Sequence, residues 1–361
     1  MLKKIFFALS IIVLTACSKD ANDIIDTSEP DPNPSDVVAK TRLTDAAFRV
    51  GAAVKTTQLA ESVFANTFSA HFNQLSAEWE MKMELIWSSA TNYNWTKADE
   101  LVQFAENNNM AVHGHTLVWY KSFPNWFKNA NLDSVAFESH VKTYIQNVVS
   151  RYKGRVVGWD VVNEIFNDNG TLRSVDCLVF KTFKDPIGFY GRCFQYARDA
   201  DPETKLFYND YNVVLASGKR YAIKQMVERF KRDGYPIDGI GDQFHYMVTT
   251  NQNTIRTGLN DMASTGLMLH ISELDLRVNV NKSDSYVFTE SEQQTQADAY
   301  QFIVESFEAI PQQQKYAIST WGVTDKYTWL TGWWHPKEYP LLFDANYNKK
   351  KAYEGFLKGL K

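Results

Sequence analysis

Short apolar runs alternate with amphipathic segments along most of the chain, and this alternation limits the fold more than any other feature. Eight runs long enough for strands occur at residues 48–54, 71–77, 111–119, 156–164, 205–211, 239–246, 267–276 and 316–322. Helix-like stretches separate them: residues 291–309 carry Ala299, Phe302 and Phe307 at helical spacing, and residues 217–232 open with a serine suited to a helix cap. Eight strands alternating with helices predict an α/β fold, the parallel (β/α)8 TIM barrel.

An open, doubly wound sheet would produce the same local pattern. Such sheets often carry a glycine-rich dinucleotide fingerprint after the first strand, and none follows residues 48–54. The chain has 361 residues, of which 44% are hydrophobic and 22% charged, so it can bury a large core. Because no linker or internal repeat interrupts residues 41–361, we predict that they form one barrel domain.

The N-terminal residues predict export and membrane attachment. The apolar stretch 5–14 follows two lysines and is too short to span a membrane, which is typical of a secretion signal. The tetrapeptide Leu-Thr-Ala-Cys that ends at Cys17 resembles a bacterial lipobox, although a plain secretory signal with an incidental cysteine is the alternative. We therefore expect residues 1–17 to be a lipoprotein signal peptide with Cys17 as the lipidated residue. Residues 18–40 are polar and proline-rich, which predicts a disordered tether and a protein at the outer membrane or cell surface of a Gram-negative bacterium.

Charge and aromatic content limit the choice of partner. The net charge of −4 provides no basic surface to follow nucleic-acid phosphates, so no polynucleotide partner is expected. Ten tryptophans offer flat faces that suit pyranose rings as well as hydrophobic cores. Cys177 and Cys193 would lie in a compartment that permits a disulfide, but we expect two separate buried thiols and leave their pairing open.

Two glutamates each close an apolar run. Glu164 ends the run 156–164, and Glu273 follows residues 267–272. The C-terminal ends of barrel strands meet at one mouth, so both carboxylates are expected there. Two carboxyl groups that face one sugar can divide glycoside hydrolysis, because one protonates the leaving oxygen while the other attacks the anomeric carbon. The pair therefore predicts a glycoside hydrolase.

Other polar and aromatic residues also fall at or just beyond the ends of the predicted strands. They are Lys82, His115, Trp119, Asn163, Gln243, His245, Asp275 and Trp321. Each has a structural alternative, such as capping a helix or filling the core. Their shared position on six strand ends favours a common binding cleft.

Several motifs in chain order resemble those of xylanases of glycoside hydrolase family 10. The motifs are residues 114–119 (Gly-His-Thr-Leu-Val-Trp), 159–164 (Trp-Asp-Val-Val-Asn-Glu), 272–275 (Ser-Glu-Leu-Asp) and 320–325 (Thr-Trp-Gly-Val-Thr-Asp), with further matches at 72–75, 207–211 and 340–344. The resemblance spans the predicted barrel. It implies a retaining endo-β-1,4-xylanase that hydrolyses xylan or xylo-oligosaccharides by double displacement, as a monomer without cofactor or metal.

The resemblance also implies roles for individual residues. Glu164 would be the general acid/base and Glu273 the nucleophile, with their carboxyl groups about 5 to 5.5 Å apart. His245, oriented by Asp275, would keep Glu273 ionised, and the charge of Glu273 would favour a proton on Glu164 until glycosylation neutralises that charge. The implied substrate-binding residues are Glu78, Lys82, His115, Trp119, Asn163, Tyr211, Gln243, His245, Trp321 and Trp329.

Three positions depart from the family pattern. Trp79 replaces a usual asparagine, His113 a usual arginine and Tyr120 a usual histidine. Trp79 offers an apolar face where the family has a hydroxyl contact, so we expect the distal subsite to accept a decorated or atypical chain.

Three alternative readings of the site stay open. In the first, the protein is a surface glycan-binding lipoprotein with a catalytically weakened barrel, because a fold alone does not establish catalysis. In the second, it is a retaining endo-hydrolase of a related β-glycan, because glucan units differ from xylan units only by a hydroxymethyl group, which a pocket discriminates weakly. In the third, His113 and His115 share one face of a strand and begin a metal site.

Overall fold

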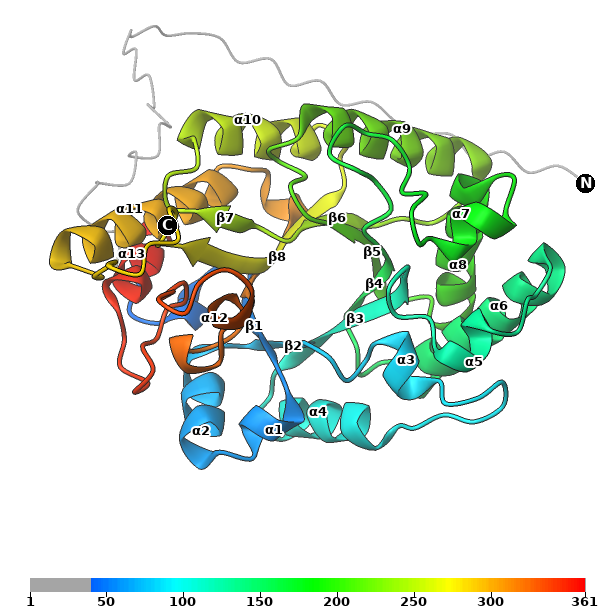
Figure 1. Ribbon diagram of the computed structural model, residues 1–361, viewed down its shortest axis with the longest axis horizontal. Helices are drawn as coiled ribbons and strands as arrows, with labels where there is room; N and C mark the ends of the chain where they lie inside the picture. Colours follow the sequence, from blue (N-terminus) through cyan, green and yellow to red (C-terminus); the bar gives the residue numbers. More distant parts are fainter. Residues whose placement is uncertain (1–39, 361) are drawn as a thin grey trace, which may run out of the picture. The chain divides into compact units, whose positions relative to one another are not determined.

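Eight parallel strands close into a barrel in the computed structural model, which describes residues 40–360 (Figure 1). The barrel strands are β1 (Arg49–Val54), β2 (Gln74–Ala77), β3 (Ala111–Trp119), β4 (Gly158–Asn163), β5 (Lys205–Asp210), β6 (Gly239–Asp242), β8 (Met268–Arg277) and β9 (Lys315–Thr320). Each strand pairs in parallel with its neighbours, and the pairings of β1 with β9 and of β6 with β8 close the ring. The predicted TIM barrel is confirmed.

The sixth predicted strand is divided in two. Strand β6 ends at Asp242, and the short strand β7 (His245–Met247) pairs with the far end of β8. Between them Phe244 has a φ of 56°, in the left-handed region that bulky residues rarely adopt, and this interrupts the strand. The interruption places His245 directly opposite Asp275 in the register.

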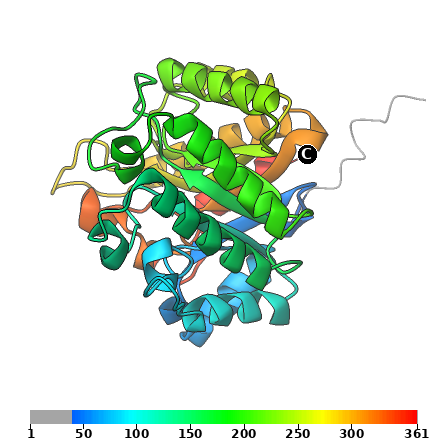
Figure 2. The ribbon, with the colours of Figure 1, turned by 90° about the vertical axis from the view of Figure 1, so that its right-hand side faces the viewer.

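Helices cover the outside of the strands (Figures 1 and 2), and Figure 2 shows α6 and α8 crossing the outer face of the barrel. The longer ones are α2 (Ser62–His71), α4 (Thr96–Asn107), α6 (Ser134–Arg151), α8 (Pro186–Ala200), α9 (Ser217–Asp233), α10 (Gln252–Ala263), α11 (Glu290–Glu308) and α13 (Lys351–Gly359). Shorter helices are α1 (Thr56–Leu59), α3 (Met83–Ile86), α5 (Asn125–Lys128), α7 (Leu178–Thr182) and α12 (Leu330–Trp333), with 3-10 turns at Leu43–Asp45, Gln312–Gln314 and Asp325–Tyr327. Within residues 40–360 no helix is long and apolar enough to cross a membrane.

Two helix starts were predicted from the sequence, one more accurately than the other. Helix α11 begins after Thr289, where a capping box forms: Glu292 donates its backbone N–H to the Thr289 hydroxyl and accepts from the Thr289 N–H at 2.8 Å. The predicted serine cap of α9 is wrong. Ser217 is already helical, and Ala216 in the cap position has no side-chain hydrogen bond. The helix ends at Gly234, whose φ of 79° suits a glycine C-cap.

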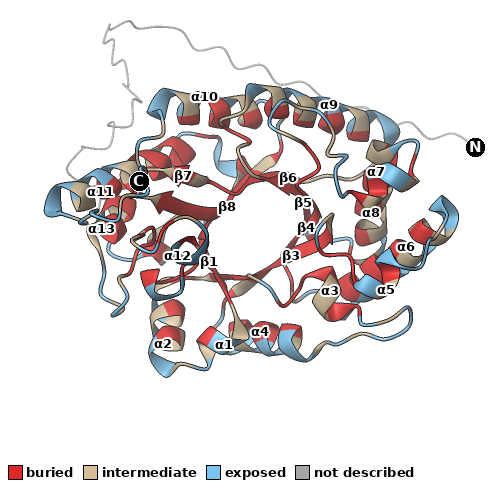
Figure 3. Ribbon diagram, in the orientation of Figure 1, coloured by how far each residue is buried: buried red, intermediate tan, exposed pale blue. Residues whose placement is uncertain are grey.

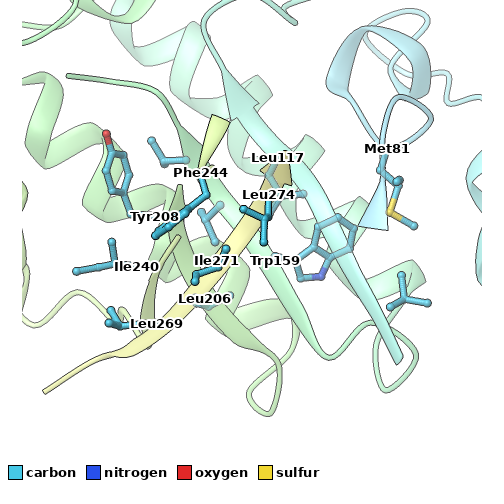
Figure 4. Packing of buried hydrophobic residues seen from close by; sticks show 14 of the residues in the cluster. Met81, Leu117, Trp159, Leu206, Tyr208, Ile240, Phe244, Leu269, Ile271 and Leu274 are labelled. Atoms are coloured by element: carbon cyan, nitrogen blue, oxygen red, sulfur yellow. The ribbon is translucent and has the colours of Figure 1, made fainter. Parts of the chain in front are cut away.

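The core lies in two layers, one between strands and helices and one inside the ring. The strands are buried along their length, while the helices expose only their outer faces (Figure 3). Figure 4 shows Trp159, Leu206, Ile240 and other apolar side chains packed around the strands. Inside the barrel, the rings of Phe207 and Tyr316 lie 4.4 Å apart. The same interior also holds polar side chains, since His113 and His270 pack against these two rings, and the inner face of the ring is therefore not wholly apolar.

Cys177 and Cys193 are both free and buried, which confirms the expectation of separate thiols. The predicted signal peptide 1–17 with its lipidation site Cys17, and the predicted tether 18–40 apart from Lys40, lie outside the described residues.

Candidate active site

A cavity of about 490 Å³ opens at the C-terminal mouth of the barrel. It is lined by Lys82, His115, Trp119, Lys121, Asn163, Glu164, Tyr211, Asn212, Gln243, His245, Glu273, Arg277, Trp321, Trp329 and Trp333. Of the residues predicted for the site, those brought together here are Lys82, His115, Trp119, Asn163, Glu164, Tyr211, Gln243, His245, Glu273, Trp321 and Trp329. Glu78 and Asp275 do not line the cavity.

The carboxylate of Glu273, within β8, is buried and held at both oxygens. Asn209 donates its side-chain N–H to Oε1 at 2.9 Å, and His245 Nε2 lies 3.2 Å from Oε2. Asn209 is itself fixed, because its Oδ1 accepts from the Ser272 hydroxyl at 2.7 Å. A carboxylate held in this way keeps one orientation toward the cavity.

Asp275 lies behind His245 and completes this arrangement. His245 Nδ1 is 2.9 Å from Asp275 Oδ2, and Trp329 donates its indole N–H to the same oxygen at 2.8 Å. Burial opposes a charge on His245, but Asp275 and Glu273 outweigh it and raise the pKa of His245 to about 10. His245 is therefore protonated at neutral pH and donates to both carboxylates. The structure thus brings His245 and Asp275 together as the resemblance implied.

Glu164 follows the last residue of β4 and has a φ of 57°, again in the left-handed region. Its backbone N–H donates to the carbonyl of Asn209 at 2.9 Å. Its carboxylate accepts from the Trp119 indole at 3.0 Å and from the Gln243 amide at 3.1 Å. Both donors are neutral, unlike the imidazolium that holds Glu273.

Asn209, at the end of β5, contacts both glutamates: its side chain binds Glu273 and its carbonyl binds the N–H of Glu164. It also donates to Asn163 Oδ1 at 3.1 Å. Sequence reasoning placed Asn209 in a motif without giving it a role. Its position at a strand end between the strands of the two glutamates was the signal that could have identified it.

Lys82 reaches the cavity between two indoles. Its ammonium lies 4.5 Å from the ring centre of Trp79 and 4.9 Å from that of Trp119. Burial lowers the pKa of Lys82, and the negative charges of Glu273, Glu78 and Glu164 oppose that effect. A cation in this position partly offsets the negative charge of these glutamates.

His113 and His115 share Asp160 below the cavity. His113 Nε2 and His115 Nδ1 lie 3.0 and 2.8 Å from its two oxygens, and His113 Nδ1 lies 3.0 Å from the Tyr316 hydroxyl. Burial opposes ionisation of Asp160, but the two imidazoles hold its pKa below the usual range. Both nitrogens of His113 are thus engaged, and residues 40–360 contain no group of three or more His, Cys, Asp or Glu side chains suited to a metal.

Glu78 points to a partner outside the cavity. Its carboxylate pairs with the Lys55 ammonium at 2.7 Å, and burial raises the pKa of Glu78 despite that cation. The neighbouring Trp79 is 45% exposed at the rim. Sequence reasoning did not identify the Lys55 contact, because Lys55 follows β1 and only strand pairing brings it to Glu78.

Four cavity residues were not predicted: Lys121, Asn212, Arg277 and Trp333. Trp333, on α12, is 59% exposed and stacks on Trp329, with ring centres 4.7 Å apart. The tryptophan-rich segment 329–334 was a signal for it. Arg277 donates to the carbonyl of His245 at 2.8 Å and so supports β7 from the end of β8.

A TIM barrel whose mouth presents two oriented glutamates beside indole faces defines a glycoside hydrolase. The family model described as glycosyl hydrolase family 10 matches residues 39–359, and the chain belongs to this family.

Solved structures of similar proteins include native xylanase 10B from Thermotoga maritima, with a TM-score of 0.80 and 33% identity over 88% of this chain and 97% of that one. Native xylanase10C from Cellvibrio japonicus has a TM-score of 0.83 and 34% identity over 90% of this chain and 75% of that one.

Among curated relatives, endo-beta-1,4-xylanase Xyn10C of Cellvibrio japonicus is 36% identical over 87% of this chain, and exoglucanase XynX of Acetivibrio thermocellus is 34% identical over 85% of it. The matched regions span 56% and 28% of those two relatives.

Proposed function

We propose that the chain is a retaining endo-β-1,4-xylanase. The observation that carries the proposal is the pair of glutamates in one cavity, where an imidazolium holds Glu273 and neutral donors hold Glu164. The family and its relatives named as xylanases support xylan as the substrate. A Cellvibrio japonicus xylanase10C mutant solved in complex with xylopentaose and a Thermotoga petrophila xylanase 10B solved with xylobiose support a cleft for linked xylose units.

In the first step, a Glu273 oxygen attacks the anomeric carbon while Glu164 gives its proton to the leaving oxygen. The new bond neutralises Glu273, and Glu164 is left as a carboxylate. It then takes a proton from a water that attacks the same carbon, which releases the sugar with retained configuration and restores both groups.

Neighbouring residues support the charge that develops at the sugar. Asn163 accepts from Asn209 through Oδ1, so its amide N–H groups are available to a sugar 2-hydroxyl in the cavity. Such a contact strengthens as the ring becomes positive in the transition state. His245 lies within hydrogen-bond distance of both Asp275 and Glu273, so its positive charge faces the carboxylate that attacks the sugar.

A related β-glycan is the second candidate substrate, and the relative named exoglucanase XynX favours it. Product analysis on a panel of xylans and β-glucans separates the two candidates. We expect short xylo-oligosaccharides of mixed length from xylan and little product from glucans, with Glu273→Ala as the inactive control. Faster release from glucan would reverse the assignment, and binding without product from either polymer would favour a glycan-binding protein.

We also propose that Trp79 makes the distal subsite tolerant of decorated chains. Glu78 is turned to Lys55, and the exposed indole offers a ring face instead of hydroxyl contacts. Trp79→Asn should lower kcat/KM on arabinose-substituted xylan about 3- to 10-fold more than on plain xylan, as expected when about 1 kcal/mol of stacking is lost. Tyr221→Asn, an exposed aromatic on α9, is the control. Equal effects of Trp79→Asn on both xylans would contradict the proposal.

Lipidation of Cys17 at the outer membrane is a further proposal, supported by the lipobox-like sequence. Labelled fatty acid should be incorporated into the wild type and the Ser18→Ala control but not into Cys17→Ser. A wild type that incorporates no label and is recovered in soluble fractions would argue for a plain secretory signal. Protease treatment of whole cells would then distinguish a surface from a periplasmic orientation.

A further inference from the structure

Arg173 lies outside the cavity and nevertheless holds the backbone of Glu164. Its Nε donates to the Glu164 carbonyl at 3.0 Å, and its Nη2 donates to the Tyr211 hydroxyl at 2.7 Å. Arg173 does not line the cavity, whereas Glu164 and Tyr211 both do. One planar guanidinium therefore joins two cavity residues from behind, on segments that follow β4 and β5.

The chain after Glu164 folds back so that Arg173 can reach it. Residues 167–171 form a turn in which Asn167 donates to the Thr171 carbonyl at 2.9 Å, and Phe166 bridges to Leu172. Arg173 then donates its own backbone N–H to the Ile165 carbonyl at 2.8 Å. This short hairpin places the start of the Arg173 side chain beside Glu164.

Tyr120 supports the guanidinium from a third segment, which follows β3. The Arg173 guanidinium carbon lies 4.5 Å from the centre of the Tyr120 ring. At position 120 the chain has a tyrosine where the family usually has a histidine. The ring of Tyr120 forms a cation–π contact with Arg173. Lys219 also contacts Tyr211, with its ammonium 3.6 Å from the ring centre.

The backbone of Glu164 needs such support because of its conformation. A φ of 57° is uncommon for a residue with a long side chain and persists where surrounding contacts fix it. The N–H of Glu164 is fixed by Asn209, and its carbonyl is fixed by Arg173. The backbone conformation sets the direction in which the carboxyl group leaves the chain.

We propose that Arg173 is a positioning residue for Glu164, aligning the general acid with the leaving oxygen without touching substrate. This inference rests on the proposed function, in which Glu164 protonates that oxygen. A misaligned acid harms only reactions whose leaving group needs a proton. Substrates with a very good leaving group therefore report whether Arg173 acts through Glu164 or through general stability.

The experiment compares kcat/KM on xylo-oligosaccharides with kcat/KM on 2,4-dinitrophenyl β-xylobioside, whose phenolate leaves without protonation. In Arg173→Lys the charge is kept but the two-pronged contact is lost. We expect a fall of about 10- to 100-fold on xylo-oligosaccharides, part of the 10²–10⁴ that a general acid contributes, and a fall below about 3-fold on the aryl substrate. Tyr120→Leu should also lower kcat/KM on xylo-oligosaccharides relative to that on the aryl substrate, but by a smaller factor.

Arg220→Lys is the matched control, because Arg220 likewise binds a backbone carbonyl, that of Val214, and a side chain, Asp261. Arg220→Lys should leave the ratio of the kcat/KM values on the two substrates unchanged, even if the melting temperature falls. An unchanged ratio in Arg173→Lys, in a wild type active on both substrates, would overturn the positioning role and leave the proposed function intact. A wild type inactive on both would contradict the proposed function instead. If Arg173→Lys does not fold, the ratio for Tyr120→Leu decides.

Discussion

The two glutamates of the cavity are held in opposite ways. Glu273 lies within β8, and its carboxylate is bound by an amide and by a protonated imidazole that Asp275 supports. Glu164 lies just beyond β4, and among residues 40–360 its carboxylate accepts hydrogen bonds only from the neutral N–H groups of Trp119 and Gln243. A charged donor stabilises a permanent anion, whereas neutral donors let a carboxyl group gain and lose a proton during the cycle.

Removal of the Glu273 carboxylate should have the largest effect on activity. Glu273→Ala should lower kcat/KM by on the order of 10⁴-fold or more on every substrate, because the variant lacks the carboxylate that forms the covalent intermediate. Steady-state assays on xylan and on an aryl xylobioside measure the loss. A loss on xylan alone would mean that Glu273 is not the nucleophile.

Removal of the other glutamate should give a selective loss. Glu164→Ala is expected to lower kcat/KM on xylan by about 10²- to 10⁴-fold, the range of general acid catalysis, and to change it far less on 2,4-dinitrophenyl β-xylobioside. Its matched control is Glu164→Gln, which keeps the side-chain shape and should show the same selectivity. Equal losses on the two substrates would show that the two glutamates do not divide the work as their surroundings indicate.

The sequence predicts most of the fold, and the reasons are local. Each of the eight apolar runs overlaps a barrel strand. Glu164 follows the end of β4 and Glu273 lies within the longer strand β8, and both line the cavity at the mouth. The break at Phe244 was not visible, because a phenylalanine gives no sequence signal that its φ will be positive. The contacts of Asn209 and Lys55 depend on the register between neighbouring strands, and the contact of Arg173 with Glu164 depends on the hairpin after β4. The spacing of residues along the chain specifies neither of these.

The charge of His245 accounts for much of the difference between the surroundings of the two glutamates. Its pKa is raised to about 10 in the folded protein, from about 6.5 in the unfolded chain. The stability that this proton contributes is complete below pH 6.5 and is lost as the pH rises through 10. The free energy of unfolding of wild type should therefore exceed that of His245→Asn at pH 6, and this difference should narrow by about 4 kcal/mol by pH 10.

Denaturant titrations across this pH range measure the free energy of unfolding of both proteins. The difference between wild type and His245→Asn is compared, because other groups also titrate in this range. Burial raises the pKa of Asp210 to about 7, but Asp210 is present in both proteins and cancels from the comparison. His71→Asn is the control, because burial lowers the pKa of His71, which therefore stays neutral between pH 6.5 and 10, and its gap should not narrow. A constant gap for His245→Asn would show that His245 is neutral, and Glu273 would then be held, like Glu164, by neutral donors alone.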